Sequence, residues 1–112
     1  MSLDISLTIT KPVEVYWANI THNLGKMASK VKCGEHSLYE YLWRPEEIGI
    51  KRAKELIEPL KEGLAKLKAK PKFYEKYNSP NGWGLYKHFV PFVEKYLAAC
   101  EENPKAKIGV SR

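Results

Sequence analysis

The residues best suited to chemistry in this chain lie in three short segments that mix polar and aromatic side chains. The first segment, residues 17–23, contains Asn19, Thr21, His22 and Asn23. It joins the end of an expected strand to the start of an expected helix, and helix N-termini present free N–H groups that suit anions. His22 can bind a ligand or act as an acid or base near neutral pH. The alternative is structural, with threonine and asparagine capping the helix and the imidazole packing nearby.

The second segment is Trp43-Arg44, which is followed by Glu46 and Glu47. A guanidinium group can hold a phosphate or a carboxylate through two parallel hydrogen bonds. Arg44 can equally pair with one of the two glutamates or cap the end of a helix. Trp43 would supply aromatic contact area beside it.

The third segment is Asn81-Gly82-Trp83-Gly84. Glycines on both sides of Trp83 allow close approach of the backbone and an exposed indole, which would suit ligand contact together with Asn81. In the alternative, the segment is a turn whose tryptophan anchors the last helix to the core.

Metal and nucleophile chemistry lack a specific motif. Cys33 and His36 have a ligand-like separation, with His22 upstream, but His88 and Cys100 form no second close pair. A structural zinc site needs four ligands, usually in paired spacings, so we expect no metal. The chain has no glycine-rich phosphate loop and no local catalytic signature, and we expect no cofactor.

The overall composition predicts one small domain spanning residues 1–112. The chain has 44% hydrophobic and 29% charged residues, which is ordinary for a globular protein, and only two cysteines. No apolar run approaches the roughly 20 residues of a membrane span, and the N-terminus lacks a signal-peptide pattern. We therefore predict a cytoplasmic protein without a membrane partner.

The positive charge is unevenly distributed. The formal net charge is +6, and residues 51–112 carry it while residues 1–50 are slightly acidic. Much of the excess comes from lysines between Lys51 and Lys76, on an expected helical stretch. Such lysines are typical of a solvated helix face with i,i+4 pairs, and the alternative is a patch for nucleic acid. We expect the solvated face, and so no nucleic-acid partner.

Hydrophobic periodicity predicts an α+β fold. Residues 5–10 and 13–20 have strand character, separated by Lys11-Pro12. The helical segments that we expect then follow: a short helix from Thr21 or Asn23 to Cys33-Gly34, residues 37–43, residues 48–67 with a kink or a new helix at Pro59, a turn at 71–77, and residues 84–102. Residues 107–110 resemble a closing strand. We predict a two- or three-stranded sheet from the N- and C-terminal segments, with the helical middle packed on it.

Several longer sequence motifs resemble a small, uncharacterised protein family associated with bacteriophages, mobile elements and their bacterial hosts. These motifs are NITHNLGKMA at 19–28, LWRPEEIG at 42–49, LIEPLKEG at 56–63, NGWG at 81–84 and the final VSR at 110–112. The resemblance covers nearly the whole chain and implies no activity. It implies an accessory protein that binds something.

Three functions follow from these observations. The first is a non-enzymatic binding module, in which the polar residues of 19–23 share a cleft with Arg44 and Trp83 and bind a small polar or anionic ligand or a partner protein. The second is a small enzyme with His22 as acid or base and Arg44 as anion holder. The third is nucleic-acid binding through the lysine-rich helix. An unpaired edge strand at either terminus would also allow a homodimer.

Overall fold

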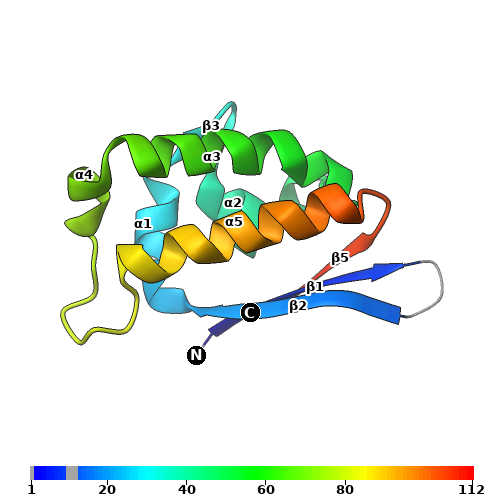
Figure 1. Cartoon of the computed structure of the whole chain (residues 1–112), viewed down its shortest axis with the longest axis horizontal. Helices are drawn as coiled ribbons and strands as arrows, with labels where there is room; N and C mark the ends of the chain where they lie inside the picture. Colours follow the sequence, from blue (N-terminus) through cyan, green and yellow to red (C-terminus); the bar gives the residue numbers. More distant parts are fainter. Residues whose placement is uncertain (1, 10–12) are drawn as a thin grey trace.

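A three-stranded antiparallel sheet joins the two ends of the chain. The computed structural model describes residues 2–9 and 13–112, so the predicted break at Lys11-Pro12 lies outside the described residues. The strands are β1 (Ser2–Ile9), β2 (Val13–Thr21) and β5 (Lys107–Ser111), in the order β2-β1-β5 (Figure 1). Leu3 lies opposite Ile20, and Leu7 opposite Ile108. This confirms the predicted sheet.

The sheet is covered by helices on one face (Figure 1). Leu3, Ile5 and Leu7 of β1 are fully buried, whereas the residues between them are partly exposed. This alternation is the period of two expected for a strand with one face on the core. The fold is α+β, as the sequence predicted.

The segment after β2 differs from its prediction. A 3₁₀ turn, η1 (His22–Leu24), leads into α1 (Gly25–Ser29), and Thr21 caps the turn by accepting a hydrogen bond from the Asn23 N–H. The predicted helix through Cys33-Gly34 is wrong in its second half, because β3 (Lys32–Cys33) and β4 (His36–Ser37) form a small hairpin. The Leu38 N–H donates to the Val31 carbonyl, so the hairpin brings Leu38 back beside Val31.

Most of the remaining helices follow the sequence, but the helix predicted over residues 48–67 begins as an α-helix only at Ile57, because Arg52 pairs with Lys107 beside the sheet. Ser37 and Glu40 form a capping box at the start of α2, which explains why that helix begins where the sequence predicts. Pro59 lies in the first turn of α3, where its missing N–H needs no partner, so the alternative of a new helix is confirmed. The elements are α2 (Leu38–Trp43), η2 (Pro45–Ile48), η3 (Ala53–Leu56), α3 (Ile57–Ala69), α4 (Pro71–Glu75) and α5 (Tyr86–Glu102).

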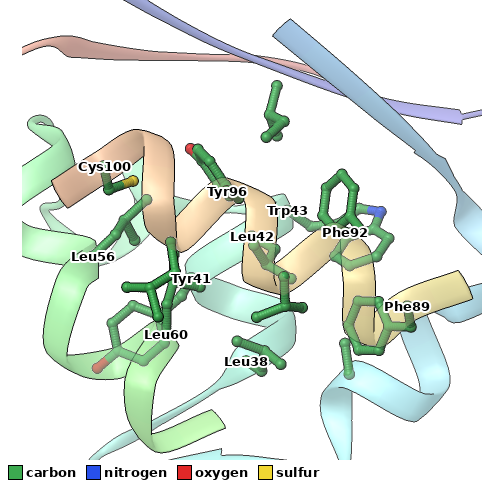
Figure 2. Packing of buried hydrophobic residues seen from close by; sticks show 14 of the residues in the cluster. Leu38, Tyr41, Leu42, Trp43, Leu56, Leu60, Phe89, Phe92, Tyr96 and Cys100 are labelled. Atoms are coloured by element: carbon green, nitrogen blue, oxygen red, sulfur yellow. The ribbon is translucent and has the colours of Figure 1, made fainter. Parts of the chain in front are cut away.

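The buried hydrophobic side chains of the described residues form one cluster between the sheet and the helices. Figure 2 shows the contributions of α2, α3 and α5, with Leu42, Leu60 and Phe89 among them. Large apolar side chains also remain on the surface: Trp17 and Trp83 are 52% and 73% exposed. In residues 2–9 and 13–112, no helix has the length and apolar character required to cross a bilayer.

Both cysteines are buried, and their thiols should react slowly. Burial, helped by Glu62, raises the pKa of Cys33 to about 11, and burial with Glu101 raises that of Cys100 to about 12. The thiolate is the reactive species, so a shift of this size leaves about a hundredfold less of it than an exposed thiol has. We expect Ellman's reagent at pH 8 to label both cysteines at least that much more slowly in the folded protein than in guanidinium chloride. A Ser111→Cys variant, with an exposed thiol, is the control, and rapid labelling of the native wild type would contradict the burial.

Candidate functional site

Two of the predicted segments are in direct contact although they lie far apart in the chain. The Asn23 Nδ2 donates to the Trp83 carbonyl at 2.7 Å. Gly84 packs so closely that an added Cβ would lie 2.8 Å from the Asn23 Cβ. The turn that opens α1 and the loop that precedes α5 therefore form one unit.

Hydrogen bonds within the 78–85 loop position its tryptophan. The Asn81 Oδ1 accepts from the Ser79 hydroxyl at 2.6 Å and from the Trp83 N–H at 2.9 Å. The Asn78 Oδ1 accepts from the Tyr86 N–H at 2.7 Å and so ties the loop to the start of α5. Trp83 does not anchor the helix to the core, because its side chain points largely into solvent. Asn81 therefore stabilises the conformation of the loop through its two hydrogen bonds.

A hollow of about 380 Å³ lies where the loop meets the end of β2. Its lining consists of Asn19, Ile20, Thr21, Leu24, Gly82, Trp83, Gly84 and His88. Asn19, Thr21 and Trp83 are thus brought together, which is part of the arrangement that the binding hypothesis required. His88 was not predicted as a ligand contact. Its spacing on α5 from Pro91 and Lys95 was the available signal, since residues three and four apart share a helix face.

A second hollow of about 240 Å³ continues the first along the same helix. It is lined by Tyr16, Ala18, Asn19, Ile20, His88, Pro91, Phe92 and Lys95. Asn19, Ile20 and His88 line both hollows. Together the two hollows form one groove between β2 and α5, which we call the β2–α5 groove.

The groove offers cationic and apolar contacts. Lys95 and His88 line it, whereas no aspartate or glutamate does. Lys95 makes no ion pair with the part of the chain that the structure describes; on the same helix, Glu94 pairs with Lys68 at 2.8 Å. The lining side chains can bind an anionic or apolar group.

His22 belongs to a neighbouring cluster built around Trp43. Trp43 is only 2% exposed, and its indole N–H donates to the His22 Nδ1 at 2.8 Å. Because an indole nitrogen only donates, Nδ1 must accept, and the proton of the neutral imidazole lies on Nε2. Trp43 also stacks on Tyr39 at 5.3 Å between ring centroids. These contacts make Trp43 part of the packed interior and not an exposed ligand contact.

Arg44 lies outside the β2–α5 groove. Its Nη1 is 2.7 Å from the Glu47 carboxylate, and its Nε donates to the Tyr39 hydroxyl at 3.3 Å. The two partners raise the pKa of the guanidinium further above its usual range, Tyr39 contributing most. The other glutamate, Glu46, pairs with Arg112 at 2.8 Å. The structural alternative, pairing with a nearby glutamate, is therefore what Arg44 does, and it does not share a hollow with Asn19, Thr21 and Trp83.

Within residues 2–9 and 13–112, no three histidine, cysteine or acidic residues lie close enough to hold a metal ion. The groove is the candidate site because it is lined by residues of two of the predicted segments and by α5. Comparison with known proteins adds no relative: no protein-family model, no curated protein and no solved structure matches this chain, and the phage-associated family stays a prediction.

Proposed function

We propose that this protein is a non-enzymatic binding module whose β2–α5 groove binds an anionic segment of a partner protein. The observation that carries the proposal is the continuity of two hollows that share three residues and end at an exposed tryptophan. The groove has a sheet edge on one side and a helix on the other.

The shape of the groove favours a chain segment over a small ligand. Small-molecule pockets enclose most of their ligand, whereas both hollows are open to solvent and follow one another. Trp83 presents a large aromatic surface at one end, and tryptophan is enriched among the residues that dominate protein interfaces. Ile20 and Phe92 supply apolar contact along the floor.

The charge of the groove favours an acidic partner. Lys95 has no carboxylate partner among the described residues, and His88 adds a second nitrogen donor nearby. An aspartate, a glutamate or a C-terminal carboxylate of the partner would gain a charge-assisted hydrogen bond there. The net charge of +6 would also attract an acidic segment at a distance.

The proposal predicts that groove variants lose peptide binding. The probe is a library of random 12-residue peptides displayed on phage, selected against the full chain, with affinities then measured by fluorescence polarisation. We expect selected peptides to carry acidic and apolar residues. Trp83→Ala and Lys95→Glu should each weaken their binding about tenfold or more, as interface hot spots do.

Two matched variants serve as controls. Lys107→Glu makes the same charge change on β5, and Phe73→Ala removes an exposed aromatic ring from α4; both residues lie outside the groove. Both should bind within about twofold of wild type. The proposal is overturned if selection yields no peptide with a Kd below about 100 µM. It is equally overturned if the groove variants bind as tightly as the controls.

A further inference from the structure

The outer edge of β2 is free of backbone partners within the described chain. The opposite edge of the sheet is not, because the Ile108 N–H donates to the Lys51 carbonyl at 3.1 Å and Arg52 forms a bridge with Lys107. In the order β2-β1-β5, only β1 has strands on both sides. Alternate residues of the nine in β2, about 30 Å of strand, thus present unpaired N–H and C=O groups on the open side.

The sequence of β2 does not protect this edge. Natural proteins usually block an open edge with lysine, proline or a covering segment. The segment Val13–Thr21 contains neither lysine nor proline, and its one charged residue, Glu14, lies at its start, away from the groove lining. Val13, Val15 and Trp17 are instead 50%, 38% and 52% exposed. Such an edge is suited to pairing with another strand.

The β2–α5 groove lies directly beside this edge, and its spacing matches a strand. Tyr16, Ala18 and Ile20 line it, and they are alternate residues on the inward face, opposite Leu7, Ile5 and Leu3 of β1. A strand added to β2 would direct every second side chain to that same face. Those side chains would enter the two hollows and meet α5.

We infer that the partner's anionic segment binds as an additional strand on β2 and extends the sheet to four strands. This inference rests on the proposed function, because it concerns how the same groove is used. Main-chain hydrogen bonds to β2 would provide affinity, and the hollows would select alternate side chains, as in known cases of strand addition. An acidic side chain of the segment would pair with Lys95.

Charge argues against a second copy of this chain as the occupant. Pairing β2 with β2 of another copy would place the two grooves along one seam, with the Lys95 ammonium groups of both copies beside it. Neither groove has a carboxylate to balance them, and each copy has a net charge of +6. Like charges at such a seam oppose association.

The test uses the tightest peptide from the selection described above and methylates its backbone amides one at a time. A strand on a sheet edge uses only every second N–H for pairing. We expect methylation to weaken binding by about tenfold or more at alternate positions and by less than about threefold between them. Amide hydrogen exchange on the protein should show new protection within Val13–Thr21 when the peptide binds, and the methylated peptide should not produce it.

The failures can be told apart. If the peptide depends on Trp83 and Lys95, but methylation has no alternating effect and β2 gains no protection, strand addition is overturned and the proposed function stands. If the groove variants bind normally, the proposed function itself fails. A third outcome is that the chain sediments as a dimer and that the peptide converts it to a monomer while protecting β2. This would show that a second copy of the chain pairs with the β2 edge, and it would overturn the inference that the partner of this edge is an anionic segment of another protein.

Discussion

Replacing Trp43 with alanine is expected to lower the free energy of unfolding by about 3–5 kcal/mol. The side chain is 2% exposed, stacks on Tyr39 and donates its N–H to His22, so the substitution removes packing and leaves a cavity. A domain of this kind has a total stability of about 5–15 kcal/mol, so the loss would be a large fraction of it. Urea denaturation followed by circular dichroism measures it.

Two further variants separate packing from the hydrogen bond. Trp43→Phe keeps an aromatic ring but removes the donor to His22, so it should cost less than the alanine variant. Trp83→Ala, at a position 73% exposed, should change stability by no more than about 0.5 kcal/mol. If the free energy of unfolding of Trp43→Ala lies within about 1 kcal/mol of the wild-type value, this tryptophan is not part of the core.

Replacing Gly84 with alanine is expected to destabilise both the protein and its groove. Gly84 has a φ of +114°, which L side chains rarely adopt, and this conformation alone costs about 1–3 kcal/mol. The added Cβ would also lie 2.8 Å from the Asn23 Cβ and push the loop away from the start of α1. Thermal unfolding measures the stability, and binding of the selected peptide measures the groove.

Gly82→Ala is the matched control, because Gly82 also has a positive φ, +79°, but has open space where a Cβ would lie. Both variants carry conformational strain, and only Gly84→Ala adds the overlap with Asn23. Gly84→Ala should therefore be the less stable of the two and should bind peptide more weakly. Equal stability and equal binding would mean that the contact between Asn23 and the loop does not shape the groove.

The last helix links the fold to the proposed site. Phe89 and Val93 of α5 are fully buried in the core, whereas His88, Pro91 and Lys95 line the groove. One helix therefore packs the core with one side and borders the groove with the other. Substitutions at the groove side can test binding with little effect on the core, which is why Lys95→Glu is an informative variant.

Local sequence patterns predicted an element correctly where the pattern is compatible with only one type of secondary structure. The alternation in β1 and the capping box of Ser37 and Glu40 each specify an element through neighbouring residues. The prediction was wrong between Val31 and Ser37, where Val31 and Cys33 are the only apolar residues, a pattern too short to distinguish the end of a helix from a hairpin. There, burial of Val31 and Cys33 against the rest of the core decided the outcome.

The sequence alone determined the α+β class, the identity of the polar and aromatic segments, and the positive charge of the second half of the chain. Only the tertiary structure decided which segments meet: Asn23 contacts Trp83 across 60 residues, His88 joins them, and Arg44 pairs with Glu47 elsewhere. The reason is physical. Helix and strand preferences depend on neighbours in the chain, whereas the groove depends on how the sheet and α5 pack, and local residue patterns do not encode that packing.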